Sequence, residues 1–199
     1  MLKIGITGGI GSGKTTVCKI YEVLGIPVFY ADHAAKAIMH TDVLLKKNII
    51  SGFGEQSYSK KGQLNSKYLS SIVFNNETEL NKLNALVHPA VFRAFDIWVS
   101  EQIGVPYVIK EAALLFESES HKMCDETVLV VSPEALRIKR ILERGGISSK
   151  EVRLRMKRQL TDERKQELAD HVILNDEKNL LIPQVLALHQ HFLMHDHDH

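Results

Sequence analysis

A glycine-rich stretch, GITGGIGSGKTT at residues 5–16, limits the folds open to this chain more than any other segment. It contains the pattern G-x-x-x-x-G-K-[ST] as Gly8, Gly13, Lys14 and Thr15, between an apolar run and a segment with apolar residues at helical spacing. Strand, loop and helix in this order are the context in which the pattern forms a phosphate-binding loop. Its glycines let backbone N–H groups turn toward phosphate oxygens, and the helix N-terminus favours an anion there.

The same motif assigns roles to three polar side chains. Lys14 is expected to reach the β- and γ-phosphates of a nucleoside triphosphate, and the Thr15 hydroxyl is expected to bind Mg²⁺. Thr16 is expected to add a contact to the α-phosphate. The loop therefore predicts a protein that binds a nucleoside triphosphate together with magnesium.

Further apolar runs predict the strands of a parallel sheet, because short, continuous apolar segments are typical of strands buried on both faces. These runs occupy residues 2–7, 27–32, 105–111, 126–131 and 171–175. Predicted helices alternate with them, and one begins with Ser132 as N-cap and Pro133 at the first helical position, then stops at Gly145-Gly146. We therefore expect an α/β fold of the P-loop nucleotide-binding type, a parallel sheet flanked by helices.

The alternation of strands and helices is interrupted between residues 33 and 104. Several stretches with helical patterning and one glycine- and serine-bearing connection predict a helical insertion over 33–104. The nucleotide-binding core is then expected to comprise residues 1–32 and 105–199. Within the insertion, His88-Pro89 is interpreted as the start of a helix, with proline at its first position.

The chain is predicted to end in a helix over roughly 183–193 that leads into MHDHDH. Five of the ten histidines fall in the last eleven residues: His189, His191, His195, His197 and His199. Such a cluster could bind transition metals opportunistically. Because chain termini are commonly disordered, we expect these residues to form a frayed, solvated end.

Composition argues against several classes of function. The net charge is +1, and no apolar run approaches the ~20 residues that a membrane helix needs, so neither nucleic acid nor membrane binding is expected. The start of the sequence lacks the pattern of a signal peptide, which predicts a cytoplasmic location. Cys18 and Cys124 have no CxxC spacing and are expected to be reduced packing residues. No feature indicates an obligate protein partner.

A P-loop alone does not define the reaction. The NKxD and DxxG motifs of GTPases are absent, and 199 residues leave little room for a motor ATPase. A small-molecule kinase needs a carboxylate that holds the acceptor hydroxyl toward the γ-phosphate. Asp32 is the candidate, because it lies at the expected C-terminal end of the second strand, where parallel sheets bind ligands. The same residue could instead cap a helix beginning at His33-Ala34.

A basic segment over residues 137–165 carries eleven Lys or Arg against four Asp or Glu. Solvated helix faces would explain this charge, and so would a lid that closes on a phosphate. An arginine in such a lid can accelerate phosphoryl transfer by ~10³–10⁵. Arg140 is the first candidate for that contact, with Gly145-Gly146 as the hinge.

With these features in place, the sequence resembles the dephospho-coenzyme A kinase family over nearly its whole length. The matching stretches are TGGIGSGKTT (7–16), GIPVFYAD (25–32), GQLNSKYLSSIVF (62–74), LNALVHPAV (83–91), ALLFES (113–118), VSPEALRIKRILER (131–144) and RMKRQL with ADHVILN (155–175). LNALVHP and ALLFE after a P-loop are specific to this family rather than to P-loop proteins at large.

The resemblance implies that ATP and Mg²⁺ phosphorylate the ribose 3′-hydroxyl of dephospho-coenzyme A, which gives coenzyme A and ADP in the last step of coenzyme A biosynthesis. It implies that Asp32 activates the hydroxyl, that Arg140 belongs to the lid and that the insertion covers the acceptor. His88, Phe116 and Glu117 are candidates for acceptor contacts, with a helix start as the alternative for His88 and core packing for Phe116. The residues implied to hold ATP are Gly11, Ser12, Gly13, Lys14, Thr15, Thr16 and, near the adenine, Asn175.

A few positions depart from the family pattern. Tyr30 replaces the first aspartate of Asp-Ala-Asp, and Asn65-Ser66 replaces Asp-Arg. Ala113 replaces a proline, and the acidic residue upstream of it is Glu111. These changes bear on magnesium and acceptor binding but leave the P-loop and Asp32 in place, so activity is expected.

Two other interpretations stay open. One is a P-loop kinase that acts on a nucleoside, a nucleotide or a shikimate-like alcohol. The other is an ATP-sensing binding module that transfers phosphate to no small molecule. A sensor needs no acceptor carboxylate, so the position of Asp32 argues against it.

Overall fold

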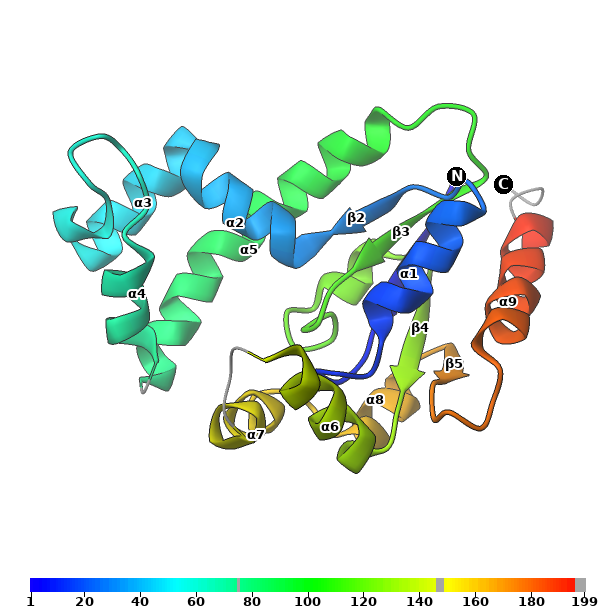
Figure 1. Cartoon of the computed structure of the whole chain (residues 1–199). Coiled ribbons are helices and arrows are strands. Elements are labelled where there is room, and N and C mark those ends of the chain that lie inside the picture. Colours follow the sequence, from blue (N-terminus) through cyan, green and yellow to red (C-terminus); the bar gives the residue numbers. More distant parts are fainter. Residues whose placement is uncertain (75, 146–148, 196–199) are drawn as a thin grey trace. The chain divides into compact units, whose positions relative to one another are not determined.

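A computed structural model describes residues 1–74, 76–145 and 149–195 of the chain, which divides into two compact units. One unit combines Met1–Tyr30 with Gln102–His199, and it contains a parallel sheet. The other unit, Ala31–Glu101, is built mainly of helices (Figure 1).

The sheet confirms the predicted parallel α/β fold. Among the described residues its five strands are parallel and lie in the order β2-β3-β1-β4-β5. Their bounds are β1 Leu2–Thr7, β2 Val28–Tyr30, β3 Tyr107–Glu111, β4 Glu126–Val131 and β5 His171–Leu174. Ile6 is in register with both Glu111 and Val128, so the C-terminal ends of β1 and its two neighbours lie at one edge of the sheet.

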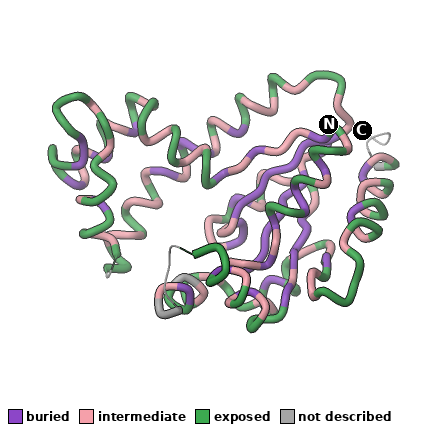
Figure 2. The backbone as a smooth tube through the Cα atoms, in the orientation of Figure 1, coloured by how far each residue is buried: buried purple, intermediate pink, exposed green. Residues whose placement is uncertain are grey.

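The main core of this unit lies between the sheet and two helices, α1 (Lys14–Val23) and α9 (Leu181–His195). Ile4 and Ile6 of β1 are fully buried in it together with Tyr21 of α1. Figure 2 shows the buried strands and the partly exposed helices beside them. β1 is therefore a rigid support for the loop that follows it.

Both cysteines are packing residues, as predicted. Cys18 is fully buried in the core, Cys124 lies against Gly5 of β1, and both thiols are free. Burial raises the pKa of the Cys124 thiol to about 11 and raises that of Cys18 further. Neither thiol is ionised near neutral pH, which argues against a nucleophilic role.

Among the described residues, three helices lie between β4 and β5 in the sequence: α6 Glu134–Arg144, α7 Ser149–Lys157 and α8 Asp162–Leu168. The predicted start of α6 is wrong by one residue. Pro133 is the N-cap, because the Ser132 hydroxyl accepts a hydrogen bond from Arg140 instead of capping the first turn. α6 ends before Gly145, which has φ 71°, as predicted, whereas Gly146 lies outside the described residues.

The helical unit consists chiefly of α2 Ala31–Thr41, α3 Val43–Phe53, α4 Ser66–Val73 and α5 Glu77–Ser100. The helices α2, α3 and α4 all pack against α5. Periodicity did not predict α4, whose start is fixed by the Asn65 side chain accepting a hydrogen bond from the Tyr68 N–H at 3.1 Å. In the described part of the chain, no helix is both long enough and apolar enough to cross a membrane.

The second strand is shorter than predicted, and this changes the setting of Asp32. β2 is an edge strand that pairs only with β3 and ends at Tyr30. Asp32 therefore lies in the first turn of α2 and is exposed. A carboxylate is favoured there by the helix dipole, which explains why the strand gives way to a helix before Asp32 and not after it.

The predicted helix start at His88-Pro89 is wrong, because Pro89 lies inside the continuous helix α5. Proline removes one backbone hydrogen bond and crowds the preceding turn. α5 nevertheless buries Val87, Ala90 and Phe95 on one face, and this packing holds the helix together through the proline.

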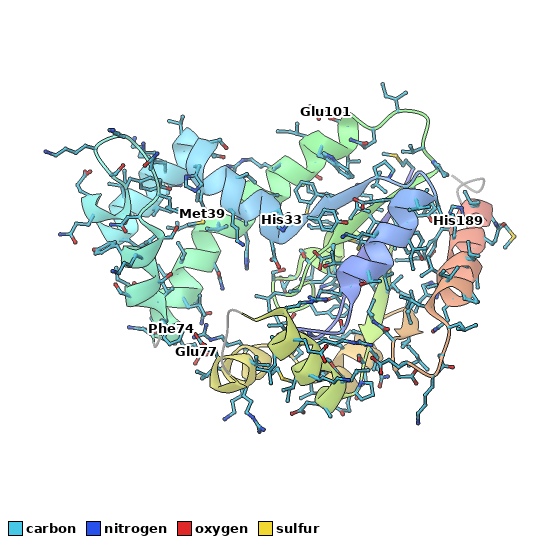
Figure 3. The ribbon with its side chains drawn as sticks, in the orientation of Figure 1. His33, Met39, Phe74, Glu77, Glu101 and His189 are labelled. Carbon is cyan, nitrogen blue, oxygen red and sulfur yellow. The ribbon has the colours of Figure 1, made fainter. Side chains whose placement is uncertain are left out.

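The expected frayed C-terminal end is also wrong for His189 and His191. Both lie on α9, which continues to His195 because Val185 and Phe192 anchor it in the core (Figure 3 labels His189). The Tyr107 hydroxyl lies 2.6 Å from His189 Nδ1, and burial lowers the pKa of His189. Residues 196–199, with His197 and His199, lie outside the described residues.

Replacing Pro89 by alanine should raise the free energy of unfolding of the helical unit by about 1 kcal/mol. The substitution restores a backbone donor within α5 and removes part of the ~3 kcal/mol that a mid-helix proline costs. Pro183→Ala is the control, because Pro183 lies in the first turn of α9, where its missing N–H has no intrahelical acceptor. Urea unfolding followed by circular dichroism should show a gain for Pro89→Ala alone, and equal midpoints for both variants would contradict the argument.

Candidate nucleotide site

The P-loop joins β1 to α1 at the C-terminal edge of the sheet. Gly13 is the N-cap residue, and α1 begins at Lys14. The Lys14 side chain is only 8% exposed and curls back over the loop, where its Nζ donates to the Gly8 carbonyl at 2.9 Å. The ammonium group and the start of the helix thus place positive charge in the same small space.

Glycine is required at two points of this loop. Gly11 and Gly13 have φ values of 81° and 96°, a conformation that residues with side chains rarely adopt. A Cβ added at Gly13 would lie 2.1 Å from Asn175 Nδ2, and one at Gly11 would lie 2.7 Å from the Arg137 carbonyl oxygen. The backbone therefore has the bare, concave form that the sequence motif predicted.

The polar groups of the loop fit a bound phosphate. Within the described residues, the hydroxyls of Thr7 and Ser12 are buried and have no hydrogen-bond partner, which is costly unless a ligand supplies one. Thr15 and Thr16 lie exposed in the first turn of α1. A triphosphate can satisfy the buried hydroxyls, and the Thr15 hydroxyl is accessible to a magnesium ion.

Asn175 connects the loop to α6. Its Nδ2 donates to the Ser12 carbonyl at 2.7 Å, while Arg140 donates to the Asn175 backbone oxygen at 3.3 Å and to its Oδ1 at 3.4 Å. Arg140 also lies 3.5 Å from a carboxylate oxygen of Glu177. The structure thus brings together two of the predicted residues, Asn175 and Arg140, beside the P-loop.

Arg137 is a residue that the sequence analysis missed. It is 8% exposed, and a Cβ added at Gly9 would lie 1.7 Å from its Nη1, so its guanidinium packs directly on the P-loop. Asp162 of α8 forms an ion pair with it at 3.2 Å. The signal was present in the sequence, because Arg137 precedes Arg140 by three residues and so shares its face of the helix.

Gln159 supports the loop from another segment. Its Oε1 accepts a hydrogen bond from the Ile10 N–H at 2.9 Å, and its Nε2 donates to the Ala113 carbonyl at 3.0 Å. Beside these groups lies a cavity of about 780 Å³ whose walls come from the end of β4, from α6, α7 and α8, and from Asp176. A cavity of this size can hold a nucleoside.

Phe116 and Glu117 lie within the packing of the sheet unit. Phe116 is 5% exposed, and its ring centroid lies 5.3 Å from that of His121. Glu117 Oε1 accepts a hydrogen bond from the Leu160 N–H at 2.8 Å and lies 3.3 Å from Nζ of Lys165, whose side chain is fully buried. These contacts explain both residues without a substrate, and their role at the acceptor stays a prediction.

Asp32 and His88 belong to the helical unit. Asp32 is exposed in the first turn of α2. His88 is half-buried on α5 and stacks on Phe92, with ring centroids 6.2 Å apart. Both side chains are positioned by regular helices, and their roles toward an acceptor stay predictions.

The end of β2 differs from the pattern of aspartates that the sequence resemblance implies. Burial raises the pKa of the Tyr30 hydroxyl, and the Glu22 carboxylate on α1, with which it is hydrogen-bonded, raises it further. Tyr30 is in register with Glu111, a buried carboxylate at the end of β3. A carboxylate at a strand end was the signal that selected Asp32, and the same signal could have selected Glu111.

Comparison with known proteins identifies the relatives of this chain. The sequence model of the dephospho-CoA kinase family matches residues 2–180, which include the P-loop, Arg137, Arg140 and Asn175. The chain belongs to the dephospho-CoA kinase family. A dephospho-CoA kinase of Salinibacter ruber is 44% identical over 178 residues, 88% of this chain and 89% of that protein. One from Bacteroides fragilis is 37% identical over 187 residues, 94% of this chain and 91% of that protein.

Solved structures agree with this family assignment. The crystal structure of TT1252 from Thermus thermophilus matches with a TM-score of 0.84 at 31% identity and covers 96% of this chain and 97% of its own. Dephospho-CoA kinase from Campylobacter jejuni matches with a TM-score of 0.67 at 25% identity and covers 98% of each chain. The fold of the dephospho-CoA kinase family therefore extends over both units.

Replacing Glu117 by glutamine tests whether this residue is structural. The substitution leaves the buried Lys165 ammonium without its anionic partner, so the free energy of unfolding should fall by about 3 kcal/mol. The double variant Glu117→Gln/Lys165→Met should regain most of that loss, because the buried charge is then removed as well. Chemical denaturation measures both effects. An unchanged stability combined with a higher KM for the acceptor would instead assign Glu117 to the acceptor site.

Proposed function

We propose that this protein transfers the γ-phosphoryl group of ATP to the ribose 3′-hydroxyl of dephospho-coenzyme A, which yields coenzyme A and ADP. The family match over residues 2–180, together with the P-loop conformation around Lys14, carries this proposal. This reaction is the last step of coenzyme A biosynthesis.

The P-loop binds the triphosphate of ATP in this proposal. Residues Gly11 to Thr16 surround the phosphates, and the Lys14 ammonium leaves the Gly8 carbonyl to contact the β- and γ-phosphates. Asn175 and the adjoining cavity hold the nucleoside end. The Thr15 hydroxyl would hold Mg²⁺, with the Glu111 carboxylate as a candidate partner, and a bound magnesium ion supplies neutralisation of phosphate charge.

Asp32 orients the acceptor in the reaction. The 3′-hydroxyl oxygen attacks phosphorus, the bond between the γ-phosphorus and the β–γ bridging oxygen breaks, and the hydroxyl proton passes to the Asp32 carboxylate. Arg140 compensates the negative charge that develops, and Arg137 supports the P-loop by packing against Gly9. The helical unit covers the acceptor, with His88 as a contact residue.

The basic segment over 137–165 is proposed as a lid whose closure excludes water. Arg140 presently contacts Asn175 and Glu177, so closure would exchange the Glu177 carboxylate for a phosphate oxygen. Exchange of one anionic partner for another needs little additional desolvation of the guanidinium. This exchange gives Arg140 a role in the transition state without a large movement of α6.

Asp32→Asn should lower kcat by about 10²–10⁴ and leave the KM for ATP unchanged, because the substitution removes the proton acceptor but no phosphate ligand. Lys14→Ala should abolish turnover and weaken ATP binding as well. The control is Asp42→Asn, since Asp42 caps α3 through the Leu45 N–H and asparagine caps equally well. Steady-state kinetics with dephospho-coenzyme A measures all three. A kcat for Asp32→Asn near that of the unmodified protein would eliminate the proposed role.

A panel of acceptors at fixed ATP separates the proposed reaction from its alternatives. Dephospho-coenzyme A should be phosphorylated with the highest kcat/KM, ahead of nucleosides, nucleotides and shikimate-like alcohols. A preference for one of the other alcohols would keep the kinase chemistry and replace the substrate. ATP binding by folded protein without transfer to any acceptor would favour the sensing module.

A further inference from the structure

Three metal-ligating side chains converge at the start of the strands. Glu126 is the first residue of β4, His171 is the first residue of β5, and His191 lies on α9. β1, β4 and β5 are parallel, so the starts of β4 and β5 lie at the edge of the sheet opposite the P-loop, which follows the end of β1. The cluster is therefore separate from the nucleotide site.

Strand register brings these side chains together. His171 is paired with Val128, two residues after Glu126, so the side chains of Glu126 and His171 point to the same face of the sheet. α9 packs on that face through Val185 and Phe192. His191, the neighbour of Phe192, is thereby placed beside the two strand residues.

The potential ligand atoms are close enough for one ion. Glu126 Oε2 lies 2.5 Å from His171 Nε2 and 3.2 Å from His191 Nε2, and the three ligand atoms all lie within 4.8 Å of one another. An ion about 2.1 Å from each atom places tetrahedral ligands about 3.4 Å apart. The Glu126–His191 spacing of 3.2 Å is already close to this value, whereas the Glu126 carboxylate has to move back from His171 by about 0.9 Å.

The two imidazole rings are held in place before any ion binds. Their centroids lie 5.0 Å apart in a T-shaped arrangement. The fully buried Phe192 ring packs against both, at 5.7 Å from His171 and 5.5 Å from His191. Ligands whose orientation is fixed by packing lose little conformational entropy on binding.

We propose that Glu126, His171 and His191 bind a zinc ion that clamps α9 to the starts of β4 and β5. Two imidazole nitrogens and one carboxylate oxygen are ligands that Zn²⁺ prefers, whereas Mg²⁺ and Ca²⁺ favour sets of oxygen atoms. The three side chains are 22%, 22% and 34% exposed, so one side of the cluster is open to a water molecule as fourth ligand.

The cluster combines one carboxylate with two imidazoles, and side chains of these types bind a metal ion in their deprotonated forms. The family model matches residues 2–180, so His191 on α9 lies outside the matched residues.

Isothermal titration of the full chain with ZnCl₂, in the absence of ATP, tests the proposal. One zinc ion should bind per chain and raise the midpoint of thermal unfolding. Glu126→Gln and His191→Gln should each weaken zinc binding by more than about 100-fold, because losing even an outer partner of a ligand costs about 10–100-fold. Kinase turnover of both variants should equal that of the unmodified protein, since neither residue belongs to the nucleotide site.

The histidine-rich end requires its own control. His197→Asn/His199→Asn removes two other candidate ligands and should leave zinc affinity unchanged. A cobalt titration of His171→Cys gives a readout that does not depend on losing affinity, because a thiolate bound to Co²⁺ adds an intense near-ultraviolet band. The proposal is overturned if the unmodified chain binds no zinc, if the His197/His199 variant loses the binding, or if the His171→Cys variant binds cobalt without that band.

Discussion

The P-loop depends on a positive charge that is held in place before its ligand arrives. Lys14 is almost completely buried, and its ammonium group donates to the Gly8 carbonyl, so the loop contains a cation that water can barely solvate. Such a charge interacts strongly with an anion, because the effective dielectric constant near it is far below that of water. The triphosphate of ATP is the anion for which the adjoining glycine backbone leaves space. A phosphate bound there therefore lies beside a cation that is already in position.

The rest of the sheet unit keeps this arrangement from relaxing. Asn175 after β5, Arg137 on α6 and Gln159 between α7 and α8 each contact a different residue of the loop. All three come from the segment after β4, far from the P-loop in sequence. Residues from the C-terminal part of the chain thus hold the P-loop in its conformation. Loss of any one of these contacts should make the P-loop less rigid and leave the sheet unchanged.

The sequence predicted those features of the fold that depend on neighbouring residues. The glycine pattern specified the P-loop, and continuous apolar runs specified the five strands that the described residues form, because backbone freedom and burial are encoded locally. The predictions that were wrong depended on tertiary contacts. Pro89 stays inside α5 because a buried face supports the helix, and His189 and His191 are ordered because Phe192 anchors α9. These buried residues are close in sequence to the residues that they stabilise, but sequence spacing does not show which distant elements bury them.

The basic segment shows the same limit for the site. Its excess of positive charge was visible in the sequence and suggested a lid for phosphate, but the sequence could not show how much of that charge is already matched. Lys165 is paired with Glu117, and Arg137 with Asp162, across 48 and 25 residues respectively, counted from their residue numbers. Arg140 retains the weaker pairing, since its carboxylate partner Glu177 is 61% exposed. A guanidinium whose carboxylate partner is solvated can change to a phosphate partner at a small cost in free energy. A guanidinium in a more buried ion pair cannot, because its partner would be left buried and unpaired. The difference in burial of their partners therefore separates Arg140, which is able to change partners during turnover, from Arg137, which is held in a structural role.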